Sequence, residues 1–224
     1  MGDGTTTHRS TPVKVVDANV TQASAGGYFT HFVKNDGSLW AMGYNEYGRL
    51  GNGGTGDRHS PVLIVDGNVS MVSSGWQFTA FVKSDGSLWT NGRNAYGQLG
   101  DGTTTTRKSP IKVVDGNVTK VAAWGHTMFI KNDGSLWGMG MNDVGRLGDG
   151  TTTNRNSPIE IVDGNVTDVS IWGQTLFLKT NGSLWGMGQN ESGQLGIDST
   201  ANRLTPIEIV SGGVSKIAAG MSHS

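Results

Sequence analysis

The sequence predicts an all-β fold assembled from repeated four-stranded sheets, and three observations lead to this prediction. The pentapeptide DGSLW begins at Asp36, Asp85 and Asp133, and NGSLW begins at Asn181. A second series reads VDANV, then VDGNV three times, then VSGGV, and its members are separated by 49, 49, 48 and 48 residues. No segment keeps the 3.6-residue apolar period of a helix. A nearly constant spacing along the whole chain indicates a modular array.

The third unit shows how each module is built. Its apolar segments, rich in Val, Ile, Phe and Trp, are separated by the turn-forming stretches DGN, GHT and NDG. We expect strands at 109–114, 118–124, 128–133 and 135–140. The Asp-Gly pair suits the positive φ angles of a type I′ hairpin, and Ser begins the next strand. Leu and Trp then fill the space between modules, which makes core residues of Trp40, Trp89, Trp137 and Trp185.

Four strands in about 48 residues is the size of one β-propeller blade. The sequence therefore predicts a single propeller domain, 1–224, with complete blades at about 21–65, 70–114, 119–162 and 167–210. A leading outer strand at 12–16 and a trailing inner strand at 214–220 belong to incomplete blades. We expect a partial, open arc of a seven-bladed propeller, in which the exposed terminal blades allow self-association.

Composition excludes several classes of partner. Lys and Arg number 17 against 18 Asp and Glu, so no domain-wide attraction to nucleic acid is expected. The chain has no cysteine, and therefore neither disulfides nor thiolate metal sites. Apolar runs are only a few residues long, so we expect no insertion into a membrane.

Positions that vary between units carry the candidate binding residues. The turn between the first and second strands reads GGYFT, GWQFT, AWGHT, IWGQT and GMSHS in successive units. Equivalent turns share one rim of a propeller, and Trp is enriched among binding hot spots. The candidate partner-binding rim is therefore Trp76, Trp124, Trp172, Tyr28 and Met221. The alternative is that these side chains pack under the turns or plug the central channel.

A second variable row follows the third strand of each unit. Its residues mix aromatic, charged and polar types, as a protein-binding face does, although ordinary variation of solvated loops gives a similar mixture. The candidate loop face consists of Tyr44, Tyr47, Arg93, Tyr96, Met141, Asp143, Gln189 and Glu191.

Signals for catalysis, cofactors and metals are weak, and we expect a non-enzymatic protein without a cofactor. The histidines, His8, His31, His59, His126 and His223, show no metal-ligand spacing. The GNGGTG stretch at 51–56 matches a dinucleotide fingerprint, but no helix is expected after it, and it is interpreted as a turn. The DGTTT segments carry isolated carboxylates, which favours Asx or Ser/Thr turns over cation binding.

The run DGSLWAMGYNEYGRLGNG, with SPVLIVDGNV, GQLGDGTTT and the closing AAGMSHS, resembles the regulator-of-chromosome-condensation repeat over essentially the whole chain. The resemblance implies a propeller, usually of seven blades, that serves as a platform for protein interactions. Bacterial members with very regular DGTTT units, among them long surface proteins and β-lactamase inhibitors, are the most similar group, and they favour a bacterial surface or extracellular location.

We therefore expect a non-catalytic scaffold that binds a protein through one rim. The alternatives are a guanine-nucleotide exchange factor for a small GTPase, a carbohydrate-binding module and an enzyme inhibitor of the β-lactamase-inhibitor type. Exchange on Ran by the family's best-known member needs a wedge inserted in a blade, and the 48- to 49-residue spacing leaves no room for one. The arginines that the related plant photoreceptor carries in GWRHT are replaced by Gln77, Gly125 and Gly173.

Overall fold

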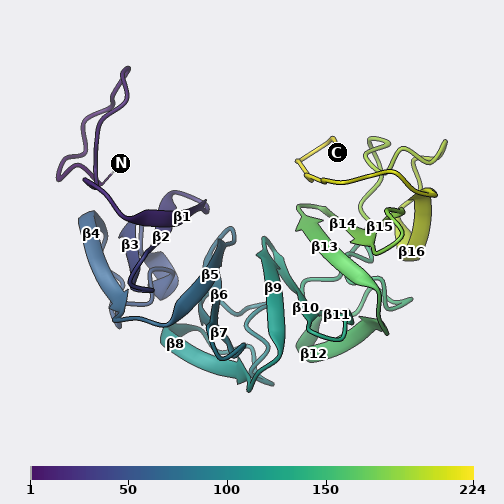
Figure 1. Cartoon of the computed structure of the whole chain (residues 1–224), viewed down its shortest axis with the longest axis horizontal. Coiled ribbons are helices and arrows are strands. Elements are labelled where there is room, and N and C mark those ends of the chain that lie inside the picture. The colour runs from purple at the N-terminus through teal and green to yellow at the C-terminus, as the bar shows by residue number, and fades with distance from the viewer. Residues whose placement is uncertain (1) are drawn as a thin grey trace.

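The computed structural model describes residues 2–224, and the chain forms an open arc of four antiparallel four-stranded sheets (Figure 1). The single helical element of these residues is the short 3₁₀ helix η1, Glu46–Gly48. The predicted fold class, an all-β protein built of four-stranded propeller blades, is confirmed.

Each sheet is one blade, and its strands follow one another in chain order from the inner to the outer edge. Blade 1 contains β1 (Val20–Ala25), β2 (Phe29–Lys34), β3 (Leu39–Gly43) and β4 (Arg58–Val65). Blade 2 contains β5 (Val69–Ser74), β6 (Phe78–Lys83), β7 (Leu88–Gly92) and β8 (Arg107–Val114). Blade 3 contains β9 (Val118–Ala123), β10 (His126–Lys131), β11 (Leu136–Gly140) and β12 (Arg155–Val162). Blade 4 contains β13 (Val166–Ile171), β14 (Gln174–Lys179), β15 (Leu184–Gly188) and β16 (Arg203–Val210).

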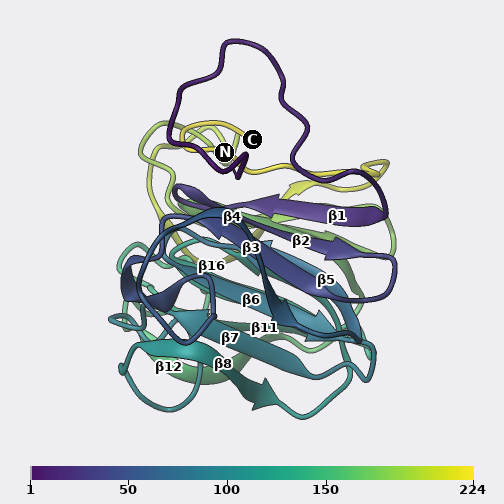
Figure 2. The same ribbon diagram turned by 90° about the vertical axis from the view of Figure 1, so that its left-hand side faces the viewer.

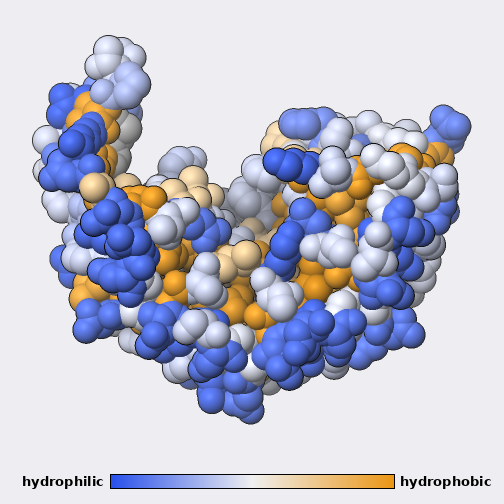
Figure 3. Space-filling model, in the orientation of Figure 1, coloured by the Kyte–Doolittle hydropathy of each residue, from blue (hydrophilic) through white to orange (hydrophobic). Residues whose placement is uncertain are grey.

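The outer strands β4, β8, β12 and β16 form the convex side of the arc, and the inner strands line its concave side (Figure 1). Figure 2 shows that the N-terminal segment loops out beyond β1. Hydrophilic residues cover the convex side, whereas hydrophobic residues follow the interior of the arc, which is hollowed at its open side (Figure 3).

The two flanking segments differ from the expected strands. Neither 12–16 nor 214–220 forms a hydrogen-bonded strand. Within residues 2–224, neither segment has a neighbouring strand with which it forms a ladder. The trailing segment nevertheless lies against blade 4, where the amide of Val214 donates to the carbonyl of Gly182 (3.1 Å). The amides of Val69, Val118 and Val166 make the same bond to the preceding blade, at 2.9 Å each. The trailing segment thus occupies the place of an inner strand.

The repeated pentapeptide is a hydrogen-bonded hairpin device. In blade 1 the Ser38 amide and hydroxyl both donate to the Asp36 carboxylate (2.9 and 2.6 Å), and the Trp40 indole N–H donates to the Ser38 hydroxyl (2.9 Å). These serine bonds lower the pKa of Asp36 below its usual value. The same three bonds recur in each of the other blades, with Asn181 in place of the aspartate in blade 4.

The expected type I′ turn is wrong. Of residues 35–37 only Gly37 has a positive φ, of 75°, whereas a type I′ turn needs positive φ at both central residues. The Gly37 amide donates to the Lys34 carbonyl, and the Lys34 amide donates to the Ser38 carbonyl. Three residues thus separate the pair that closes the hairpin, and such loops combine a type I turn with a left-handed glycine.

Leu and Trp of the pentapeptide face opposite sides of their blade and form the contacts between blades. Leu88 is fully buried and packs with Val118 and Phe129 of blade 3. Trp89 is half-buried and packs with Val72 of its own blade against Leu39 of blade 1. The exposed side of each such Trp ring is covered by a lysine ammonium at 3.8–4.5 Å from its centroid. One short sequence therefore serves two interfaces.

Side chains of one inner strand also satisfy backbone groups of the next. The hydroxyls of Ser24, Ser73 and Ser170 accept hydrogen bonds from the amides of Ser74, Ala123 and Ala219, each at 2.9 Å. These bonds occupy inner edges that would otherwise present free N–H groups, a known liability of edge strands. Between blades 3 and 4 the equivalent position is Ala122, which offers no hydroxyl.

Replacing Ala122 by Ser should therefore add the missing bond, to the amide of Ile171. We expect the free energy of unfolding to rise by about 1 kcal/mol, the usual net contribution of one hydrogen bond. Urea titration followed by tryptophan fluorescence measures this change. Ser73→Ala, which removes the corresponding bond between blades 2 and 3, should lower the same quantity by a similar amount. A loss of stability in Ala122→Ser would contradict the interpretation.

Candidate partner-binding face

The two variable rows expected from the sequence lie side by side on one end of the blades. The turns after the inner strands (26–28, 75–77, 124–125, 172–173) and the loops after the third strands (44–57, 93–106, 141–154, 189–202) share this end because the strands alternate in direction. Backbone bonds join the rows: Tyr44 N–H to Tyr28 C=O (2.9 Å), Arg93 to Gln77 (3.0 Å) and Gln189 to Gly173 (3.2 Å). We call the combined surface the turn-loop face.

The rim residues differ in exposure. Tyr28 is 84% exposed, Met221 66% and Trp76 47%, whereas Trp124 and Trp172 are half-buried. Trp124 and Trp172 stack on each other with ring centroids 3.7 Å apart. The Trp76 amide donates to the carbonyl of Trp124 (3.0 Å), which fixes the turn of blade 2 on that of blade 3. The rim therefore has a stacked, half-buried pair in blades 3 and 4 and more exposed aromatic side chains in blades 1 and 2.

The indole N–H groups distinguish the rim tryptophans from the core ones. Each of Trp40, Trp89, Trp137 and Trp185 donates to the serine two residues before it, at 2.8–2.9 Å. Within residues 2–224 no group accepts a hydrogen bond from the indoles of Trp76, Trp124 and Trp172. The rim indoles are therefore open to solvent, and a Trp with an apolar ring and a solvated N–H suits an interface, where this residue type is enriched.

A buried arginine holds the aromatic part of the face in blade 1. The Arg49 side chain is 2% exposed; its Nε donates to the carbonyl of Glu46 (2.9 Å) and its Nη1 to that of Gly27 (3.0 Å). The guanidinium also lies over the ring of Tyr44, at 4.7 Å from the centroid. Nη2 faces the Glu46 carboxylate at 3.7 Å. Arg49 therefore connects the turn at 26–28 to the loop at 44–48.

Two tyrosines of this part have an unusual backbone. Tyr28 has φ 69° and Tyr47 has φ 65°, a left-handed conformation that costs bulky side chains about 1 kcal/mol or more. Strain of this kind persists where the surrounding structure enforces it and concentrates at functional sites. Arg49, which contacts both segments, provides that constraint.

The remaining loop-face residues follow in order along the arc. Arg93 lies between the rings of Tyr47 and Tyr96, at 5.4 and 5.7 Å, and its Nη1 donates to Gln77. In blade 3, Asp143 pairs with Arg146 (3.0 Å), whose Nη1 holds the carbonyl of Gly173 (3.1 Å). Met141 and Gln189 are half-buried, and Glu191 is exposed. Within the loop row, the aromatic residues therefore belong to blades 1 and 2.

Sequence reasoning missed the asparagines that shape these loops. Asn45, Asn94, Asn142 and Asn190 are all fully buried. In blade 2 the Asn94 oxygen accepts the amide of Leu99 (2.9 Å), while its nitrogen donates to Asp101 (3.1 Å) and to the carbonyl of Thr103 (3.0 Å). Their presence at the same place in all four units was the signal that could have identified them.

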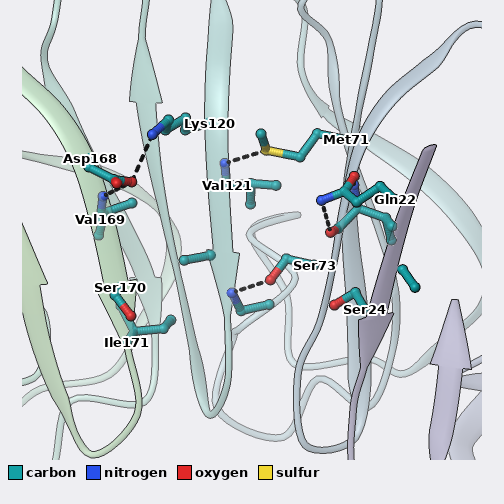
Figure 4. Close-up of a pocket in the computed structure, with 14 residues that line it drawn as sticks. Gln22, Ser24, Met71, Ser73, Lys120, Val121, Asp168, Val169, Ser170 and Ile171 are labelled. Atoms are coloured by element: carbon teal, nitrogen blue, oxygen red, sulfur yellow. Dashed lines mark hydrogen bonds and ion pairs between the residues drawn. The ribbon is translucent and has the colours of Figure 1, made fainter. Parts of the chain in front are cut away.

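The inner strands line an open pocket of about 370 Å³ on the concave side of the arc (Figure 4). Its polar side chains are engaged with one another: Lys120 pairs with Asp168 at 2.8 Å, and Gln22 accepts from the amide of Val72 at 2.9 Å and donates to its carbonyl at 3.2 Å. Met71 sulfur accepts the amide of Val121. These contacts join neighbouring inner strands across the pocket.

The segments considered for metals and cofactors are occupied by internal bonds. The Asp101 carboxylate accepts from the amide and hydroxyl of Thr103 and pairs with Arg107 at 2.7 Å, and Asp149 does the same with Thr151 and Arg155. In residues 2–224 no group of three or more His, Asp or Glu side chains is arranged to hold a metal ion. The stretch 51–56 leads into β4 and not into a helix. Over the same residues, no helix is long and apolar enough to cross a bilayer.

The tripeptide NVT or NVS, which occurs once in each unit, has a structural cause. Asn19, Asn68, Asn117 and Asn165 all adopt positive φ, which asparagine tolerates better than most residues. The hydroxyl two residues later donates to a carbonyl of the second strand, as Thr119 does to Ile130 (3.2 Å). These turns lie at the end of the blades opposite the turn-loop face.

Comparison with known proteins identifies the class of repeat propeller. The family model described as regulator of chromosome condensation (RCC1) repeat matches residues 36–82, 85–130, 133–171 and 181–224, and a second model of the same description matches 20–49. The chain belongs to this repeat family. A search of curated protein sequences gives no match.

Several solved structures share the fold. Human WBSCR16 is 24% identical with a TM-score of 0.79, covering 92% of this chain and 59% of that structure. Prp20p from Saccharomyces cerevisiae is 20% identical with a TM-score of 0.72, covering 89% of this chain and 52% of its own. Yeast RCC1 (Prp20) in a structure with Kap60 is 19% identical with a TM-score of 0.76, and the coverage is 88% and 50%. The chain thus spans between half and three fifths of these structures.

Two buried histidines beneath the face make stability depend on pH. Burial lowers the pKa of His31 to about 4 and that of His126 to about 3, from 6.5. His31 lies within hydrogen-bond distance of the Leu50 carbonyl (3.1 Å) and of Ser74 in blade 2 (3.2 Å), and His126 of Thr175 in blade 4 (2.9 Å). Both residues are therefore neutral parts of blade interfaces.

Below pH 6.5 these histidines take up protons in the unfolded chain and not in the folded one. The free energy of unfolding should therefore decrease as the pH is lowered. We expect a loss of about 1–2 kcal/mol for each histidine between pH 6.5 and pH 5. Urea titrations at several pH values measure this slope. His126→Gln copies the residue that blade 4 has at this position, Gln174, and should remove about half of the slope; an unchanged slope would contradict the assignment.

Proposed function

We propose that this chain is a non-catalytic protein-interaction scaffold that binds a protein partner through the turn-loop face. The observation that carries the proposal is the row of surface tryptophans with free indole N–H groups beside the exposed, constrained Tyr28. Trp, Tyr and Arg are the residue types most enriched among binding hot spots. Arg49 fixes the turn that carries Tyr28 by binding the Gly27 carbonyl, which reduces the backbone entropy that this turn loses on binding.

The arrangement of polar groups supports a binding role over a catalytic one. Carboxylates near the face are paired or bonded, as Asp143 is with Arg146 and Asp101 with Arg107. The buried histidines are neutral and bonded to blade interfaces. Nucleophilic or general acid–base catalysis needs a reactive group within reach of a substrate, and the face offers aromatic surface instead.

Structures with the same fold also support an interaction role. The Prp20p structure is described together with its binding to Gsp1p and histones, and another shows the yeast protein bound by Kap60. These statements concern Prp20p. They support the general proposal that a propeller of these repeats acts as a protein-binding platform, and they do not name the partner of this chain.

Site-specific photo-crosslinking tests the proposal. A photoreactive phenylalanine at position 76, on the turn-loop face, should capture a partner from an extract of the source organism as a discrete adduct. The same group at position 132, in an exposed turn at the opposite end, is the matched control and should capture none. Equal capture at both positions, or capture only at 132, would overturn the proposal.

A second interaction, between copies of the 224-residue chain, is favoured by the surface of β1. Val20 is 43% exposed, whereas Val69 and Val118 at the same place in blades 2 and 3 are 4% exposed. We propose that this uncovered inner strand of blade 1, with Val20 exposed, supports self-association. Light scattering should show a mass that grows with concentration, and Val20→Glu should reduce that growth. A constant monomer mass at high concentration would contradict self-association.

A further inference from the structure

We propose that copies of this chain associate head to tail, with blade 4 of one copy packing on blade 1 of the next as consecutive blades pack within the chain. We call this contact the joint. The inference rests on the self-association proposed above and specifies which two surfaces meet. It follows from a contact that every pair of consecutive blades makes and that is half-made at both ends of the arc.

The contact is made by the loop after the third strand, which packs on the next blade. In each pair of blades a threonine hydroxyl of the second blade donates to a loop carbonyl of the first at 2.8–2.9 Å, from Thr79, Thr127 and Thr175. A loop glycine amide of the first blade donates to the outer strand of the second at 2.8–3.0 Å, from Gly53, Gly102 and Gly150. The three pairs of blades therefore share one geometry.

A glycine in each of these loops allows the outer strand of the next blade to approach closely. A Cβ at Gly48 would lie 2.5 Å from the Cα of Lys108, and Cβ atoms at the equivalent Gly97 and Gly145 would lie 2.5–2.8 Å from Cα atoms of β12 and β16. Gly193 of blade 4 has the same positive φ, 72° against 70–78°, but a Cβ there would meet nothing within 4 Å. The loop of blade 4 is thus shaped for an outer strand that residues 2–224 do not supply.

The apolar part of the contact is also incomplete on blade 4. The leucine of the repeated pentapeptide packs with the first valine of the next blade and is fully buried in blades 1, 2 and 3, at Leu39, Leu88 and Leu136. The equivalent Leu184 is only half-buried. Val210 at the end of β16 is 41% exposed, whereas its counterparts are half-buried. Blade 4 therefore has apolar surface left for a following blade.

Blade 1 shows the complementary deficiency. Val20 is 43% exposed, whereas its counterparts in the other blades are 3–4% exposed. Thr30 and Met42 are half-buried, whereas the residues at both positions in blades 2–4 are fully buried. An open pocket of about 470 Å³ lies here, lined by the turn after β1 and by Met42. Blade 1 therefore lacks the loop and the leucine that a preceding blade supplies.

A second copy of the chain fits both surfaces. Residues 196–224 align without a gap on residues 2–30, and both stretches contain R-x-T-P, at 203–206 and at 9–12. In the joint, residues 20–30 of one copy take the place of residues 214–224 of the other, and residues 196–210 take the place of residues 2–16. This exchange of equivalent segments is a form of domain swapping.

The exchange replaces weakly paired segments by complete blades. Neither 12–16 nor 214–220 forms a strand, whereas β1 and β16 each belong to a four-stranded sheet. The amide of Gly4 donates to the carbonyl of His59 (2.8 Å), and in the joint the amide of Asp198 makes this bond. Association consequently removes a whole sheet face from water at each end, where the displaced segments cover only part of one.

Site-specific crosslinking tests the joint, because the chain contains no cysteine. His59→Cys and Asp198→Cys are prepared as separate full-length variants, mixed and treated with a short bismaleimide. We expect an adduct of two chains that joins position 59 to position 198, identified by mass spectrometry of its peptides. Gly102 and Asn156 are the same pair within the chain. A chain with both Gly102→Cys and Asn156→Cys should crosslink internally, and it calibrates the yield.

A steric variant gives an independent measurement. Gly193→Asn places a side chain where only a neighbouring copy would meet it, and asparagine tolerates a positive φ. We expect the dissociation constant of self-association, measured by sedimentation equilibrium, to rise about tenfold or more because the contact is overpacked. Gly102→Asn is the matched control, since its φ is also positive and its nearest atom would lie 3.8 Å away. It should leave the dissociation constant unchanged.

Two results would overturn this inference alone. The first is a mass that grows with concentration while no adduct joins position 59 to position 198; adducts of position 59 with itself would then indicate a two-fold contact between blade 1 surfaces. The second is equal association of Gly193→Asn and the parent chain. A mass that stays monomeric removes self-association together with this inference. Capture of a partner at position 76 is measured separately, so the proposed partner-binding function does not depend on either outcome.

Discussion

The burial of each blade against its neighbour is the interaction on which the rest of the structure depends. Leu88 on one side of blade 2 and Trp89 on the other pack into different interfaces, so one sheet is apolar on both faces. Such a sheet is stabilised most between two others, because its apolar area is then removed from water on both sides. Serine hydroxyls and backbone bonds then fix the relative position of neighbours at a spacing of 48 or 49 residues.

This constraint separates positions that hold the scaffold from positions that are free to vary. Strand residues and the buried asparagines recur because every interface and every loop needs them. Residues on the turn-loop face are not needed for these contacts, and there the units differ. Arg49 and Arg146 donate to turn carbonyls, whereas Gln98 and Gln194, at the equivalent positions, accept amides of their own loops. Function in a repeat protein is expected at such differences, since the fold does not dictate them.

The strands could be predicted from the sequence because their signals are local: apolar segments of the right length, turn residues between them and a constant period. The hairpin type was wrong, since it depends on how many residues separate the closing pair at Lys34 and Ser38, which sequence letters do not show. The strands expected at 12–16 and 214–220 are not observed, because a strand forms only when its backbone groups pair with a neighbouring strand. Both candidate rows were found, but their union into one face depends on three-dimensional contacts such as that between Tyr28 and Tyr44.

The arginines illustrate why composition alone describes this face poorly. The sequence predicts a binding role for Arg93 and for neither Arg49 nor Arg146. In the structure both donate to turn carbonyls and lie largely out of contact with solvent. Their positive charge is used to hold the turns, and each carbonyl that they bind is removed as an acceptor for ligands. The arginines therefore contribute to this face by fixing the turns at Gly27 and Gly173, and the surface left to a partner is largely the exposed rings of Tyr28 and Trp76.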